Sequence, residues 1–161
     1  SPRRAPQGAT ALGPLLTHAG LSLCFLGLAV NRLLDAGAEA LSAALKARAE
    51  SNPEDDVHLD LAIGSNLIGD AGAEAVAAAL AVGPALTGLC LEYNKVGSTG
   101  AEALAAAVRA RCAKGWPRPI VRFTGNHMDG GSAFALQNVM DEFGGAKGTL
   151  EPPSKRRRTS S

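Results

Sequence analysis

The side chains that most often carry catalysis or bind metals are few and scattered in this chain. Its histidines and cysteines are His18, Cys24, His58, Cys90, Cys112 and His127. No two cysteines have the two-residue separation of a zinc site. No serine, cysteine or pair of carboxylates recurs beside a histidine, as a nucleophile and its base require. We therefore expect no enzyme activity, no metal and no cofactor.

Cys90 is the cysteine nearest to a reactive arrangement, because Glu92 lies two residues further on. A carboxylate does not favour a thiolate, and no basic residue stands beside Cys90, so it lacks the signature of an activated nucleophile. The odd number of cysteines argues against a disulfide scaffold. It favours a reducing intracellular compartment, whether cytoplasmic, nuclear, organellar or ciliary.

Basic and aromatic side chains suited to binding gather in residues 109–119. The chain's one tryptophan stands there between a glycine and a proline, which predicts that a stiff loop holds its ring outward. Tryptophan and arginine are common anchors in protein interfaces. The partner-binding residues expected in this segment are Arg111, Lys114, Trp116 and Arg118.

A second basic run closes the sequence. After the glycine pair at 144–145 and the proline pair at 152–153 come Lys155, Arg156, Arg157 and Arg158. Such a run is typical of a nuclear-import signal, a nucleic-acid contact or a clamp on an acidic partner, and the sequence keeps all three open. We expect these four residues to bind a partner.

The rest of the chain must position these groups, and it contains one sequence motif that occurs four times. Alternating apolar residues lead to an asparagine in Leu23-x-x-Leu26-x-Leu28-x-x-Asn31, His58-x-x-Leu61-x-Ile63-x-x-Asn66, Leu86-x-x-Leu89-x-Leu91-x-x-Asn94 and Arg118-x-x-Val121-x-Phe123-x-x-Asn126. The asparagines are 35, 28 and 32 residues apart, which indicates one basic period with two insertions. Units of this length stack into a solenoid. Each asparagine falls where a strand must bend, so we expect its amide to satisfy backbone groups of the turn.

A helix is expected after each asparagine of the first three copies. The motif Gly-Ala-Glu-Ala recurs there, followed by apolar positions four residues apart. The expected helix starts are Asp35, Asp70 and Ser98. Thr99 and Glu102 have the spacing of a capping box.

This pattern resembles the leucine-rich repeat family over about residues 21–140, and its 28-residue form is similar to the ribonuclease-inhibitor or NOD-like-receptor subtype. The fourth copy departs from the pattern, with Arg118 at the first apolar position and Ser132 where the others have glycine. The resemblance implies an α/β fold. It would be a short leucine-rich repeat solenoid of about four strand-loop-helix repeats, with a parallel sheet on the concave face and helices on the convex face. It also implies a function performed by an exposed surface.

Three segments are expected along the chain: an N-terminal extension and cap at 1–20, the repeat domain at 21–143, and a Gly/Pro linker with the basic tail at 144–161. The apolar stretch from Ala9 to Val30 is not predicted to span a membrane. Pro14, His18 and three glycines interrupt it, and its second half belongs to the first strand.

Two rows of residues are expected to point outward on the concave face. The rows are Gly27, Ala62, Cys90 and Arg122, and then Ala29, Gly64, Glu92 and Thr124. The first two repeats offer almost no side chain there, so a partner's backbone could approach closely at that end. The partner contacts expected at the other end are Glu92, Tyr93, Arg122 and His127.

Both insertions fall between a helix and the next strand, so we expect an acidic loop at 46–57 and the basic loop at 109–119 on one rim. The predicted function is a non-enzymatic protein-protein interaction module, a scaffold or accessory subunit of a larger complex. The alternative is a nucleic-acid-associated or nuclear factor that uses the basic loop and tail. A net charge of +1 gives that alternative no broad basic footprint.

Overall fold

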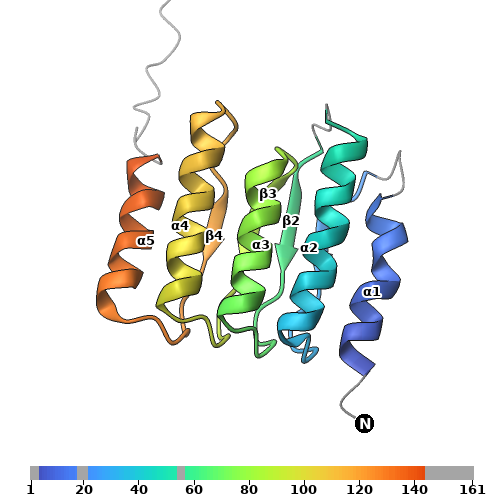
Figure 1. The fold of residues 1–161 in the computed structure, drawn as a ribbon, viewed down its shortest axis with the longest axis horizontal. Coiled ribbons are helices and arrows are strands. Elements are labelled where there is room, and N and C mark those ends of the chain that lie inside the picture. The colour runs from blue at the N-terminus through green and yellow to red at the C-terminus, as the bar shows by residue number, and fades with distance from the viewer. Residues whose placement is uncertain (1–3, 18–21, 54–56, 144–161) are drawn as a thin grey trace, which may run out of the picture.

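The computed structural model describes residues 4–17, 22–53 and 57–143, along which helices and strands alternate. The elements are α1 (Arg4–Thr17), β1 (Phe25–Gly27), α2 (Leu34–Ser51), β2 (Leu59–Ala62), α3 (Asp70–Val82), β3 (Leu86–Cys90), α4 (Ser98–Ala113), β4 (Ile120–Arg122) and α5 (Gly130–Glu142). Within these ranges the four strands lie in the order β1-β2-β3-β4, and each pairs in parallel with the next. Figure 1 shows the helices side by side in one layer, with the strands behind them. The expected α/β solenoid of four strand-loop-helix repeats is confirmed.

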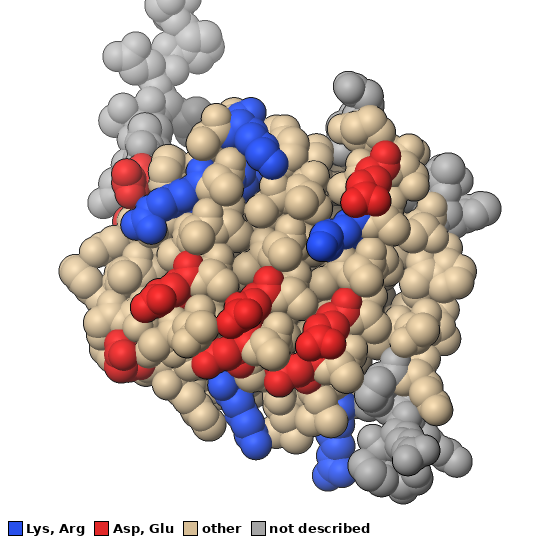
Figure 2. Space-filling model, in the orientation of Figure 1, with Lys and Arg blue, Asp and Glu red and all other residues tan. Residues whose placement is uncertain are grey.

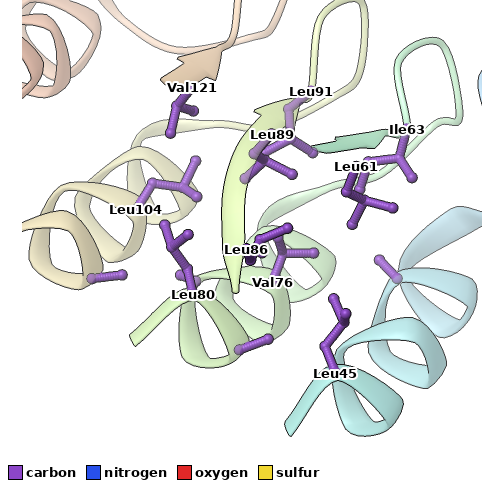
Figure 3. Packing of buried hydrophobic residues seen from close by; sticks show 14 of the residues in the cluster. Leu45, Leu61, Ile63, Val76, Leu80, Leu86, Leu89, Leu91, Leu104 and Val121 are labelled. Carbon is purple, nitrogen blue, oxygen red and sulfur yellow. The ribbon is translucent and has the colours of Figure 1, made fainter. Parts of the chain in front are cut away.

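The hydrophobic core lies between the sheet and the helix layer. Leu61, Leu89 and Val121 occupy one register position on β2, β3 and β4, and all three are buried. Figure 3 shows these strand side chains facing those of the helices, among them Leu80 and Leu104. Side chains alternate between the two faces of a strand, which is why the apolar positions of the repeated motif are buried together. Three further inward residues are half-buried and pack against the same core: Leu26, Leu28 and Phe123.

The glycine that begins each Gly-Ala-Glu-Ala motif is required by close packing between repeats. A Cβ atom at Gly72 would lie 2.6 Å from Cγ2 of Ile68 and 2.7 Å from Oδ1 of Asp35. Both separations are far below van der Waals contact, so a larger residue would displace the neighbouring repeat. Gly100 stands in the same environment one repeat later.

Asparagine side chains join the turns of neighbouring repeats. Oδ1 of Asn66 accepts hydrogen bonds from the N–H groups of Asn31 and Leu33, one repeat earlier, at 2.8 and 3.2 Å. Nδ2 of Asn66 donates to the backbone oxygens of Leu28 and Gly64. The expectation that this amide satisfies the turn is confirmed, and most of the groups that it satisfies belong to the preceding repeat.

The sequence places the helix starts within one residue but assigns their caps wrongly. The N-cap residues of α2, α3 and α4 make no side-chain cap hydrogen bond. Oδ1 of Asp35 instead accepts hydrogen bonds from the N–H groups of Gly69 and Gly72, at 2.7 and 3.0 Å. Asp35 therefore caps α3, the helix of the next repeat, rather than α2.

The capping box expected at Thr99 and Glu102 is also wrong. Helix α4 begins at Ser98. The N–H groups of Gly97 and Gly100 at this helix start already donate to Oδ1 of Asp70. The cap of α4 thus comes from the stacked repeat before it, which local sequence spacing does not show.

Helix α1 lies against α2 at the N-terminal end of the helix layer (Figure 1). Its Ala9 and Leu16 are buried and join the core. It covers the side of α2 that has no repeat before it. Nowhere in the described ranges is a helix long and apolar enough to cross a membrane.

Candidate protein-interaction surface

The concave face is the side of the sheet that is turned away from the helices. One predicted row lies in register across its strands: Gly27, Ala62, Cys90 and Arg122. A row that the sequence analysis missed lies two residues earlier on each strand: Phe25, Asp60, Gly88 and Ile120. The same alternation of period two, extended by one step toward the start of each strand, would have found it.

A shallow groove of about 130 Å³ lies over this face. Phe25 on β1 and Ile120 on β4 border it and are 62% and 60% exposed. Ala62 and Gly88 lie between them. The carboxylate of Asp60 leans over Gly88, where a Cβ atom would collide with it. Two exposed apolar side chains with small residues between them offer a partner both hydrophobic contact and close approach.

Three of the predicted contact residues lie together at the β3–β4 end of the concave face. Arg122 is the register partner of Cys90, whose Sγ donates to Oε2 of Glu92 at 3.4 Å. Tyr93 follows directly, is 65% exposed, and donates its backbone N–H to the oxygen of Thr124 on the next repeat. Ionic, hydrogen-bonding and aromatic groups therefore adjoin the groove.

Arg111 is buried, which corrects its assignment as a partner-binding residue. Its guanidinium donates to the backbone oxygens of Leu80, Gly83, Pro84 and Pro117. Burial lowers the pKa of this guanidinium. The fixed fork of N–H donors matches this set of carbonyls, so Arg111 fastens the α4–β4 loop to the end of α3.

The expectation that Trp116 is held outward is wrong, because its side chain is half-buried. Its ring centroid lies 4.6 Å from Nζ of Lys114 and 6.0 Å from Cζ of Arg111, so cations hold the ring in place. Lys114 also donates to a backbone oxygen of α3, and Arg118 donates to one of α5. The basic loop therefore uses much of its hydrogen-bonding capacity within the domain.

His127 is exposed in the loop after β4, where its backbone N–H donates to the backbone oxygen of Val96 at 2.9 Å. The tail residues Lys155, Arg156, Arg157 and Arg158 lie outside the described residues. So does the 54–56 segment of the acidic insertion. The contacts expected of these segments stay predictions.

The convex face carries carboxylates at a repeated position. Glu39, Glu74 and Glu102 are equivalent residues of α2, α3 and α4, and all are exposed. Figure 2 shows acidic side chains crossing the helix layer as a band, with basic side chains above it and at the lower edge. Such a band repels phosphate groups.

Within the described residues, no three His, Cys, Asp or Glu side chains come together as metal ligands do. The cysteines there, Cys24, Cys90 and Cys112, are free thiols. The concave face presents apolar, charged and hydrogen-bonding groups.

Comparisons with known proteins bear on the fold. No protein-family model matches the chain, and no curated protein matches it. Among solved structures it is similar to "Leiomodin-1 Actin-Binding Site 2 (ABS2)", with a TM-score of 0.61 and 19% sequence identity over 87% of this chain and 74% of that chain. That structure has a leucine-rich-repeat-like fold, in agreement with the repeat pattern. The likeness shows a shared fold and does not decide the subtype.

Proposed function

We propose that this chain is a non-enzymatic protein-interaction module, an accessory subunit or scaffold of a larger complex, which holds its partner on the concave face. The observation that carries the proposal is the groove between Phe25 and Ile120, two apolar side chains that are each about three-fifths exposed. Fully burying one such side chain is worth about 1.5 to 3 kcal/mol, so a partner that covers both gains substantial free energy.

The spacing of the groove suits a folded partner. Neighbouring strands lie about 4.8 Å apart, so β1 and β4 are separated by about 14 Å. An α-helix with its side chains is about 10 to 12 Å wide, which is close to this backbone separation, so a helix laid along the strands can contact both Phe25 and Ile120. Asp60 at the middle of the face and Arg122 at its end are exposed charges of opposite sign that would orient the occupant.

The structural likeness supports the same reading. The similar leiomodin-1 segment is named as an actin-binding site, so this fold serves protein binding in another molecule. A repeat fold of this kind presents its contacts on a surface built from several neighbouring repeats. For this chain that surface includes all four strands.

The alternative of nucleic-acid binding receives less support from the described residues. Arg111 is buried, and Lys114 and Arg118 each donate to a backbone oxygen, so much of the positive charge of the basic loop is engaged within the domain. A nucleic-acid partner therefore enters as an outcome of the test below.

The test captures partners from a lysate with the full chain and with the double variant Phe25→Ala, Ile120→Ala. The control is Phe134→Ala, because Phe134 is 67% exposed on α5, away from the concave face. We expect the double variant to lose the partner by about tenfold or more while its melting temperature stays unchanged, and the control to retain it. Retention of the partner by the double variant contradicts the proposal. Release by nuclease favours the nucleic-acid alternative instead.

A further inference from the structure

The loops that lead from the strands to the helices hold a second set of exposed side chains. In each repeat the residue before the repeated asparagine has a left-handed backbone: Val30 (φ 61°), Ser65 (φ 54°), Tyr93 (φ 56°) and Gly125 (φ 75°). Valine, being β-branched, rarely adopts this conformation. The turn directs these side chains into solvent, where Val30 is 77% and Tyr93 65% exposed.

These residues are neighbours across repeats. The N–H of Val30 donates to the oxygen of Gly64, and the N–H of Tyr93 donates to the oxygen of Thr124. A second exposed row follows the asparagines: Arg32, Leu67, Lys95 and His127. We call six exposed residues of these two rows the loop edge: Val30, Arg32, Leu67, Tyr93, Lys95 and His127.

Tyr93 is fixed in place before any partner arrives. Its ring lies over Gly125, where a Cβ atom would be 2.8 Å from Cε1 of the ring and closer still to Cδ1. An exposed aromatic ring that is already ordered loses little conformational freedom on binding. Tyr93 is therefore suited to anchor a contact.

The two charged residues of the loop edge, Arg32 and Lys95, are both basic. Among the described residues no carboxylate pairs with Arg32 or Lys95, whose side chains are exposed. The nearby carboxylate of Asp35 accepts hydrogen bonds from the start of α3, and that of Asp129 accepts them from Ser98 and Ser132. Asp70 is used in the same way at the start of α4. Figure 2 shows Lys and Arg side chains projecting from the lower edge of the molecule, below the acidic band.

We propose that the loop edge binds an acidic amphipathic helix of a protein partner, an inference that rests on the proposed function and adds a second surface to it. Neighbouring repeats are about 4.8 Å apart and one turn of an α-helix rises about 5.4 Å, so successive turns meet successive repeats. Apolar residues at positions i, i+3, i+4 and i+7 of that helix contact Val30, Leu67 and Tyr93. Flanking Glu or Asp residues pair with Arg32 and Lys95.

A nucleic acid or an anionic membrane fits this surface less well. Both need a broad array of cations, whereas the loop edge has two permanent cations interleaved with three apolar side chains. An acidic amphipathic helix matches both kinds of group at once.

The test selects binders to the full chain from a displayed library of random 14-residue peptides, and measures labelled peptides by fluorescence anisotropy. We expect the enriched peptides to be acidic, with apolar residues at helical spacing. Tyr93→Ala or Leu67→Ala should weaken them by about tenfold. The double reversal Arg32→Glu, Lys95→Glu should weaken them further, while the control Arg109→Glu, an exposed arginine on α4, should leave them unchanged.

Several outcomes overturn the inference. One is enrichment of basic or helix-incompatible peptides, another is affinity that survives Tyr93→Ala, and a third is the recovery of no peptide that depends on the loop edge. Peptides that are lost with Phe25→Ala but kept with Tyr93→Ala would place binding in the groove, so the proposed function would stand while this inference fails. Displacement of the peptides by RNA or by vesicles with phosphatidylserine, at equal charge concentration, would assign the edge to those partners. Thermal unfolding of each variant, with Tyr93→Phe as a conservative replacement, separates lost contacts from lost folding.

Discussion

Oδ1 of Asn94 accepts a hydrogen bond from the backbone N–H of Asn66, the equivalent residue one repeat earlier, at 2.9 Å. The same oxygen accepts a second bond from the N–H of Ile68 at 3.0 Å. Asn66 makes the corresponding bonds to the repeat before it. The polar groups of each turn are therefore satisfied by the next repeat, and the stack of repeats is the unit that folds.

We call these hydrogen bonds between the turns of neighbouring repeats the asparagine ladder, and they predict the effect of Asn94→Ala. The replacement leaves buried backbone groups of Asn66, Ile68 and Ile63 without partners, and each unsatisfied group costs about 1 to 3 kcal/mol. We expect the free energy of unfolding, measured by urea denaturation, to fall by about 3 kcal/mol or more. The control is Asn31→Ala, since Asn31 is exposed and its side chain donates only within its own turn. Equal losses for the two variants would mean that the ladder carries no special weight.

Asp70→Ala should destabilise the start of α4 rather than only its own helix. Oδ1 of Asp70 accepts from the N–H groups of Gly97 and Gly100 at 2.7 and 2.9 Å. Loss of a helix cap costs about 0.5 to 2 kcal/mol. Amide hydrogen exchange at residues 98–102 should accelerate in Asp70→Ala and stay unchanged in Glu74→Ala, an exposed carboxylate one turn later. Acceleration confined to α3 would count against a cap that acts between repeats.

Arg111→Ala tests whether Arg111 holds the α4–β4 loop against the end of α3. Four carbonyl groups lose their donor, so we expect a loss of about 3 to 5 kcal/mol in the free energy of unfolding. Arg109→Ala, at an exposed position of the same helix, should change it by about 0.5 kcal/mol or less. Chemical denaturation measures the loss in the free energy of unfolding for both variants. Similar losses would contradict the structural role of buried Arg111.

Leu89 and Ile120 lie on adjacent strands but on opposite faces of the sheet. Leu89→Ala removes a buried core side chain and should cost about 2 to 5 kcal/mol. Ile120→Ala removes a mostly exposed one and should cost about 0.5 kcal/mol or less. Denaturation midpoints report the difference, and a reversed order would refute the assignment of the two faces.

The fold was predictable because its signals recur in each repeat. The buried positions of Leu61 and Leu89 and the turn role of Asn66 follow from one alternation and one polar residue repeated at fixed spacing. The roles of Asp35 and Arg111 were not predictable in this way. Their partners belong to the neighbouring repeat, so no local motif contains them. Three of the hydrogen bonds of Arg111 span 27 to 31 residues, and those of Asp35 span 34 and 37.

The candidate site was predictable in part. Tyr93, Glu92 and Arg122 could be placed on the surface from their offsets to the repeated leucines. Phe25 and Ile120 were missed, although the same alternation places them on this face, because the sequence does not show how far each strand extends toward its start. Trp116 was misplaced because its contacts with Lys114 and Arg111 form only when the loop folds back on α3.

The central claim is that the concave face holds a protein partner, and hydroxyl-radical footprinting of the captured complex tests it most directly. Phe25, Ile120 and the control Phe134 are each at least 60% exposed in the free chain, so all three should be oxidised there. In the complex we predict strong protection of Phe25 and Ile120 and unchanged oxidation of Phe134. Protection of Phe134 with continued oxidation of Phe25 and Ile120 would contradict the account.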